Sequence, residues 1–337
     1  MSRNLFQSMY QFLKHLTATQ QVAAMFVVVF GILLLVSIAV VLLSIRDQGD
    51  DPASEQRGSE LQALDGLLRT SWLMVLVFWI GWLLGDWVSI GLFALVSFFA
   101  LREFLTLSPT RRGDHRSLVL AFFVVLPAQY ALVGTEHFDL FTVFIPVYVF
   151  LAIPVVSALA NDPQRFLERN AKLQWGIMVC IYGMSHVPAL LLLDFPGYDK
   201  KSAFLVFFLV IVVQTCMLVQ HLAARRLKRA PVAPNVSQSF TWQSCFVGIA
   251  VASLVGTLLA GITPFVPGQA LALSLVACFA GTMGHLVMKA IKRDRGIPNW
   301  GRQGASVTGA GGLLDRVDAL CFAAPVFFHS VRWYFSW

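Results

Sequence analysis

Charged side chains and glycines concentrate in residues 289–318, KAIKRDRGIPNWGRQGASVTGAGGLLDRVD, between two apolar stretches. The segment contains six side chains that could neutralise an anion: Lys289, Lys292, Arg293, Arg295, Arg302 and Arg316. It also contains glycines that would let backbone N–H groups approach a phosphate: Gly301, Gly304, Gly309, Gly311 and Gly312. Asp315 and Asp318, three residues apart at the start of a predicted helix, would share one helical face. A divalent cation that bridges these acids and a polyphosphate would use all three features.

The cations alone have a simpler explanation. Basic, glycine-containing loops are common between membrane helices, because cytoplasmic loops are enriched in Lys and Arg. This explanation accounts for the cations of residues 289–318, but not for two acids where a membrane helix begins. We therefore keep a site for an anion and a metal ion as the working hypothesis.

The segment Gly309–Leu320, GAGGLLDRVDAL, resembles the C-terminal signature of the phosphatidate cytidylyltransferases, also called CDP-diacylglycerol synthases. That signature runs approximately S-x-x-K-R, four residues, K-D, and then P-G-H-G-G-x-L-D-R-x-D. The matching residues are Lys292, Arg293, Gly309, Gly311, Gly312, Leu314, Asp315, Arg316 and Asp318. The departures are Lys289 at the Ser, Pro298 and Asn299 at the K-D, and Ala310 at the His.

An earlier segment, residues 214–244, resembles the family's Q-x-N-D-x-x-Q-Y and S-P-x-K-T-x-E-G patterns in outline. Ser237 and Thr241 keep polar positions of the second pattern, and the resemblance implies that they contact substrate. Several charged positions are substituted: Met217 replaces an Asp, Phe240 a Lys, Gln243 a Glu, and His285 the Asp of a G-D-L turn.

The resemblance implies a membrane enzyme that transfers a cytidylyl group from CTP to a lipid phosphate such as phosphatidate. The products would be CDP-diacylglycerol, used in phospholipid biosynthesis, and pyrophosphate. Asp315 and Asp318 are then the expected metal ligands, with Mg²⁺ as the cofactor, and together with Arg316 they are the expected catalytic residues. The expected substrate-binding residues are Lys292, Arg293, Ser237, Thr241, Gly311 and Gly312.

The substituted positions leave a second hypothesis open, a degenerate relative that binds lipid or a membrane partner without turnover. Loss of one electrostatic contact can cost about 2–4 kcal/mol of transition-state stabilisation, so two or three losses would remove most activity. A transporter is a third interpretation, since Gln214, His221 and His285 could line a polar path. No inverted repeat supports that interpretation.

The composition predicts an all-α integral membrane protein. Of the 337 residues, 57% are hydrophobic and only 13% are charged, which excludes a soluble globular domain of this length. The five cysteines lie in apolar stretches at spacings that fit no metal motif. The net charge of +7 lies in short loops, which favours lipid headgroups and phosphates over nucleic acid as partners. The oligomeric state stays open, and a homo-oligomer is one assembly that we consider.

Hydropathy predicts a polytopic bundle of about ten transmembrane helices, near residues 23–45, 71–85, 87–101, 117–133, 140–160, 173–193, 202–221, 241–262, 269–288 and 319–334. The predicted regions are an interfacial segment 1–22, a first anchor 23–45, a polar linker 46–69 and a cytidylyltransferase-like membrane domain 70–337. Alternate loops carry 20 of the 25 Lys and Arg residues. We therefore expect a multi-pass protein of the inner membrane with its polar site facing the cytoplasm.

Two ionisable residues at or within predicted spans are weaker candidates. Glu103 and Phe104 resemble an acid–aromatic pair that related cytidylyltransferases often carry, although an interfacial anchor is the commoner explanation of such a pair. His186 lies in a polar notch of an apolar helix near Pro188. A core histidine at a proline kink is the preferred interpretation of His186.

Overall fold

The computed structural model describes residues 18–46, 72, 75, 76, 79, 80, 83–106, 111–193, 195, 202–227, 229–297, 300 and 312–335. All regular secondary structure among these residues is helical, which confirms the predicted all-α class. Most of the predicted interfacial segment, nearly all of the linker 46–69 and Gly311 lie outside the described residues.

Six long helices are α2 (Ala18–Arg46), α4 (Asp86–Thr106), α11 (Ala203–Leu227), α12 (Trp242–Leu258), α13 (Pro267–Asp294) and α14 (Leu314–Phe335). Three further helices are continuous but consist of several consecutive segments. The first joins η1 (Arg112–Asp114), α5 (His115–Leu120), η2 (Ala121–Val125) and α6 (Leu126–Gly134). The second joins α7 (Phe138–Val143), η3 (Phe144–Val149) and α8 (Phe150–Ala158). The third joins α9 (Phe166–Gly176), η4 (Ile177–Gly183), α10 (Met184–Ala189) and η5 (Leu190–Leu192), and η6 (Leu259–Ile262) extends α12.

Seven of these helices are long and apolar enough to cross a membrane: Asp86–Thr106, Arg112–Gly134, Phe138–Ala158, Phe166–Leu192, Ala203–Leu227, Trp242–Ile262 and Pro267–Asp294. They correspond to the seven predicted spans from 87–101 to 269–288. The predicted first span, 23–45, lies in α2, which is helical but is not among the seven. The predicted span 319–334 lies in α14, which is helical but is not among the seven.

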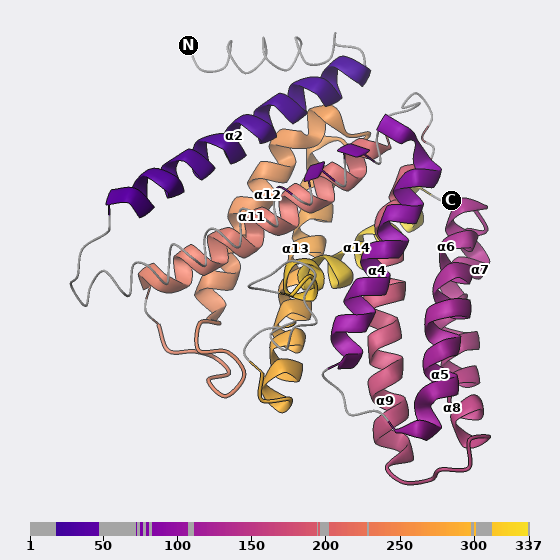
Figure 1. Cartoon of the computed structure of the whole chain (residues 1–337). Helices are drawn as coiled ribbons and strands as arrows, with labels where there is room; N and C mark the ends of the chain where they lie inside the picture. The colour runs from indigo at the N-terminus through magenta and orange to yellow at the C-terminus, as the bar shows by residue number, and fades with distance from the viewer. Residues whose placement is uncertain are drawn as a thin grey trace, which may run out of the picture.

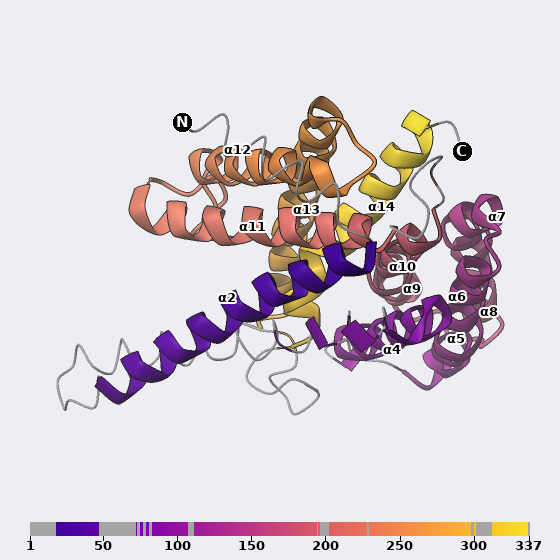
Figure 2. The same ribbon diagram turned by 90° about the horizontal axis from the view of Figure 1, so that it is seen from above.

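Two groups of helices pack on opposite sides of α14 (Figure 1, Figure 2). In one group, α11 packs against α12 and α13, and α13 packs along α14. In the other, α4 packs against α6 and α10, while α10 and η4 pack against α14. The last helix of the chain therefore holds the two groups together.

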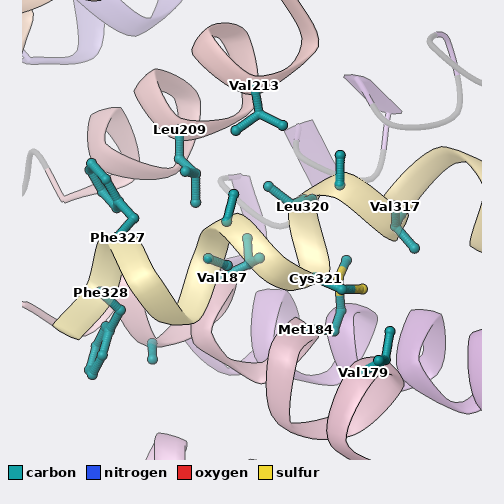
Figure 3. Packing of buried hydrophobic residues seen from close by; sticks show 14 of the residues in the cluster. Val179, Met184, Val187, Leu209, Val213, Val317, Leu320, Cys321, Phe327 and Phe328 are labelled. Atoms are coloured by element: carbon teal, nitrogen blue, oxygen red, sulfur yellow. The ribbon is translucent and has the colours of Figure 1, made fainter. Parts of the chain in front are cut away.

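The core around α14 is apolar and tightly packed. Val187 of α10 and Leu209 of α11 approach the helix from its two sides (Figure 3). A Cβ atom on Gly183 would lie 2.2 Å from the carbonyl oxygen of Cys321, so only glycine permits this approach of η4 to α14. A Cβ on Gly284 of α13 would likewise lie 2.1 Å from the Phe322 ring. These two close approaches fix α14 against both groups.

His186 is fully buried in α10, and its ring Nδ1 donates to the carbonyl oxygen of Tyr182 at 2.7 Å. The ring also packs against Phe141, at 4.6 Å between centroids. These contacts agree with the interpretation of His186 as a core histidine.

Candidate functional site

An ion pair joins the end of α13 to the beginning of α14. Nζ of Lys292 lies 2.5 Å from Oδ1 of Asp315, and both side chains are largely buried. Lys292 lies in the last turn of α13, and Asp315 lies in the first turn of α14. Each charge is opposite to the partial charge of its own helix terminus, which stabilises both side chains at these positions. The structure therefore brings two of the expected site residues, Lys292 and Asp315, into direct contact.

Trp300 provides a second contact to Asp315. Its backbone N–H donates to Oδ2 of Asp315 at 2.8 Å, while its side chain is 1% exposed and stacks on Phe104 at 5.5 Å between ring centroids. A Cβ atom on Gly312 would lie 2.5 Å from the carbonyl oxygen of Trp300. Gly312 is therefore required for the close packing of the chain against Trp300, which helps to fix the position of Asp315.

The N-terminus of α14 is bound by a side chain from α4. Oε1 and Oε2 of Glu103 accept the backbone N–H groups of Leu313 and Leu314, each at 2.9 Å. A helix leaves its first N–H groups without intrahelical acceptors, and neither leucine side chain can accept a hydrogen bond. Glu103 is 1% exposed, so its negative charge acts at short range on the positive end of the helix. Glu103 thus positions the start of the helix that carries Asp315 and Asp318.

Asp318 pairs with a histidine of α13. Nδ1 of His285 lies 2.7 Å from Oδ2 of Asp318, and Oδ1 of Asp318 accepts the N–H of Ala319 at 2.6 Å. Asp318 is 2% exposed, whereas the His285 side chain is 27% exposed. A buried carboxylate that binds one ring nitrogen fixes the orientation of the imidazole. His285 therefore stands, oriented by Asp318, at a position where the resemblance implied a third acid.

The loop between α11 and α12 reaches the same face of α13. Nζ of Lys289 donates to Oγ of Ser237 at 3.4 Å, and Ser237 is 3% exposed. Ser237 also lies 3.5 Å from the hydroxyl of Ser239. Of the expected substrate-binding residues, Ser237 thus lies beside Lys289 of α13.

Arg316 and Arg293 differ in their surroundings. Arg316 is partly buried between the two acids of α14, and its Nε atom is buried without a hydrogen-bond partner among the described residues. Burial lowers the pKa of the Arg316 guanidinium, and the nearby Asp315 and Asp318 oppose that shift. Arg293 is exposed on the last turn of α13. Arg316 therefore belongs to the enclosed part of the site and Arg293 to its rim.

Thr241 has a structural role in addition to its predicted one. Its side-chain oxygen accepts the backbone N–H of Ser244 at 3.1 Å, which makes it the N-cap of α12. Oγ of Ser244 also lies 3.4 Å from the backbone nitrogen of Thr241. The spacing T-x-x-S resembles a capping box and is a signal that the sequence itself contains. The hydroxyl of Thr241, at 4% residue exposure, is used within the fold.

Two of the substituted positions belong to the apolar core. Phe240 is 5% exposed and packs edge-on against Trp242, at 5.7 Å between ring centroids. Met217 of α11 packs against the main hydrophobic cluster. The side chains that replace the Lys and the Asp of the pattern therefore contribute no charge to the site.

Sequence reasoning missed Trp300 and gave little weight to Glu103. A tryptophan in a polar, glycine-rich loop is a usable signal for Trp300, because such a side chain tends to be buried. For Glu103, the signal is an acid at the end of an apolar span. Neither signal identifies the partner.

The donor set can be tested against the implied Mg²⁺. Among the described residues, no three His, Cys, Asp or Glu side chains converge. All four oxygens of Asp315 and Asp318 already accept a hydrogen bond or an ion pair from the chain. Mg²⁺ commonly uses one or two carboxylates and completes its shell with water and substrate phosphates. The set therefore fits an ion that arrives on a nucleotide better than an ion that the protein alone holds.

Comparison with known proteins agrees with this architecture. Residues 67–334 match the cytidylyltransferase family. The uncharacterized protein YnbB of Escherichia coli (strain K12) is 33% identical over 281 residues, covering 83% of this chain and 90% of YnbB.

Two similar proteins carry the name phosphatidate cytidylyltransferase. That of Mycobacterium leprae (strain TN) is 34% identical over 174 residues, covering 50% of this chain and 52% of the relative. That of Helicobacter pylori (strain ATCC 700392 / 26695) is 25% identical over 219 residues, covering 61% of this chain and 80% of the relative. The match to the family extends over most of the chain and includes the residues of the site. The chain therefore belongs to the cytidylyltransferase family.

Proposed function

We propose that the protein is a membrane-embedded phosphatidate cytidylyltransferase. It transfers the cytidylyl group of CTP to the phosphate of phosphatidate or a related lipid, in phospholipid biosynthesis. An oxygen of the lipid phosphate attacks the α-phosphorus of CTP, the bond from that phosphorus to the bridging oxygen of the β-phosphate breaks, and pyrophosphate leaves. Such a displacement requires positioning of two anions and neutralisation of their charge.

The observation that supports this proposal is the enclosed group of charges where α13 meets α14. Lys292 and Asp315 form the central pair, at 2.5 Å, and Asp318 lies one turn further along α14. Lys289 and Arg316 add positive charge beside the acids. Cations and carboxylates in one enclosed site suit a phosphate-bearing substrate that brings its own metal ion.

Each group has an expected role in the reaction. Asp315 and Asp318 would contact an Mg²⁺ carried by the triphosphate, and this ion supplies neutralisation of phosphate charge when bound. Lys292 and Arg316 would hold phosphate oxygens, and Ser237 would donate its hydroxyl to them. We assign the site to the cytoplasmic side of the inner membrane, because the basic loops gather there in the predicted topology.

The test uses full-length protein in lipid nanodiscs with radiolabelled CTP, phosphatidate and Mg²⁺. Label should enter the lipid with the wild type, and Asp318→Asn should lower the rate by at least about a hundredfold. Asp139→Asn is the matched control, because this acid is exposed and pairs with Arg332, away from the site. Loss of labelling in both variants, or in neither, would contradict the assignment of the site.

A degenerate relative that binds without turnover is the second candidate. The burial of Phe240 favours it, because the position where the family pattern has a lysine supplies only packing. The same experiment separates the two candidates. CTP binding without any lipid labelling would support the second candidate over the enzyme.

A further inference from the structure

Three basic side chains follow one another along a single face of α13. His285, Lys289 and Lys292 are spaced by four and three residues, the spacing that aligns side chains on one side of a helix. His285 contacts Asp318, Lys292 contacts Asp315, and Lys289 contacts Ser237. This face, which we call the basic face of α13, is directed at the first turn of α14 and at the loop before α12.

Lys289 differs from its two neighbours on that face. Among the described residues, no carboxylate lies within ion-pair distance of its Nζ atom. The one acid of α14 in its vicinity, Asp318, is already bound by His285. Its hydrogen bond to the Ser237 hydroxyl is long, at 3.4 Å. Lys289 is thus a partly buried ammonium group with one weak neutral partner.

Such a group is costly unless an anion meets it. Removing an ammonium from water is unfavourable without a counter-charge, and the next cation, Lys292, lies one turn away on the same face. A carboxylate four residues earlier would have paired with Lys289, but His285 occupies that position. The face is therefore short of negative charge at Lys289, while the adjacent Ser237 hydroxyl could donate to a phosphate oxygen.

We infer that Lys289 and Ser237 form a subsite for the terminal phosphates of a nucleoside triphosphate. The inference rests on the proposed function for the identity of the ligand as a nucleotide, CTP, whereas the need for an anion at Lys289 rests on the contacts above. Ammonium and hydroxyl groups bind non-bridging phosphate oxygens by charge-assisted hydrogen bonds. Because the chain supplies this positive charge, part of the neutralisation of the triphosphate comes from a side chain. Binding of CTP and of pyrophosphate therefore persists, though weakened, when divalent ions are removed.

The experiment measures binding of radiolabelled CTP, pyrophosphate and CMP to full-length protein in nanodiscs, with Mg²⁺ and with EDTA. Lys289→Gln should weaken the binding of CTP and of pyrophosphate about tenfold or more. It should leave the affinity for CMP within about twofold of the wild type, because CMP lacks the terminal phosphates. Lys289→Arg should restore CTP binding to within about threefold, since it keeps the charge. Ser237→Ala should weaken the binding of CTP several-fold without affecting the binding of CMP.

The matched control is Arg332→Gln, because Arg332 is a cation in the last turn of α14 that pairs with Asp139, away from the site. This substitution should leave the binding of all three ligands unchanged. The inference is overturned if the Lys289→Gln variant binds CTP like the wild type, or if its affinity for CMP falls as much as its affinity for CTP. It is also overturned if EDTA abolishes all binding of CTP and pyrophosphate.

The lipid-labelling assay keeps this inference separate from the proposed function. CTP binding that depends on Lys289, without any labelling of lipid, would support the subsite and contradict the proposed enzymatic function. Labelling of lipid with CTP binding that ignores Lys289 would sustain the enzyme and reject the subsite.

Discussion

The carboxylate of Glu103 accepts the backbone N–H of Leu314, at 2.9 Å, across 211 residues of chain. Through this bond and its counterpart at Leu313, helix α4 positions the first turn of α14. Asp315 belongs to that turn and Asp318 to the next one, so the geometry of the site depends on a residue that lies outside it.

Replacement of Glu103 should therefore lower stability. Glu103→Ala removes both acceptors from buried N–H groups and the charge at the helix terminus, and we expect a loss of about 2–3 kcal/mol in the free energy of unfolding. Glu103→Gln keeps one acceptor and should cost about 1 kcal/mol. Denaturant titration in detergent measures both. Glu168→Gln is the control, because Glu168 is exposed and pairs with Lys172 on the surface, so this substitution should leave the stability nearly unchanged. Equal losses at positions 103 and 168 would contradict the anchoring role.

The Lys292–Asp315 pair predicts non-additive effects. Asp315→Asn leaves the buried ammonium of Lys292 without its counter-charge, and should destabilise the protein by about 3–5 kcal/mol. The double variant Lys292→Met/Asp315→Asn removes the stranded charge and should recover at least about 1 kcal/mol of that loss. The free energies of unfolding of the wild type, the two single variants and the double variant together give a double-mutant cycle, which measures the interaction between the two side chains. Strictly additive losses would show that the two side chains do not stabilise each other.

His285→Asp should create a metal requirement that the wild type lacks at this position. A third carboxylate beside Asp318 adds like charge in a buried site, so the variant should lose about 1–3 kcal/mol without divalent ions. Mg²⁺ should restore about 1.4 kcal/mol once it exceeds the dissociation constant of the site tenfold. Thermal unfolding with and without MgCl₂ tests this, with His285→Asn as the control that adds no charge. Equal stabilisation of both variants by Mg²⁺ would refute the prediction.

Arg169 of α9 is predicted to be a major stabilising residue between two loops. Its guanidinium lies 2.8 Å from both Asp114 and Asp162, and its side chain is 5% exposed. Arg169→Met leaves Asp114 without its guanidinium partner and Asp162 with only the weaker pair to Arg111, and should cost about 3–5 kcal/mol.

The matched control is Arg111→Met, since Arg111 pairs with the same Asp162 at 3.4 Å but is 46% exposed. This substitution should cost less than about 1 kcal/mol. Denaturant titration of both variants measures the difference. Similar losses would mean that burial of the guanidinium does not matter.

The sequence predicted the membrane helices well, because a span leaves a strong local pattern. Each of the seven helices carries a long apolar stretch, and loops such as 161–172 interrupt the pattern with charged and polar residues. The charged segment before α14 could also be predicted as a candidate site, since its lysines and acids are close in sequence. The pairing of Lys292 with Asp315 follows from two helix ends that meet across one loop.

Contacts between distant segments could not be predicted in the same way. Nothing near Glu103 in the sequence indicates that its carboxylate binds Leu313 and Leu314, because the contact depends on how α4 packs in three dimensions. The burial of Phe240 depends likewise on tertiary packing. The cap at Thr241 is different, because its T-x-x-S spacing is a local pattern.

The separation of Glu103 from its partners also sets an order of events during biosynthesis. The ribosome adds Glu103 to the chain 210 residues before it adds Leu313. Until α14 has been made and has packed between the two groups, the acids of the candidate site are not in place and Glu103 lacks these two donors. A nascent chain that stops short of α14 therefore lacks both acids of the candidate site and the two N–H groups that Glu103 binds in the complete fold.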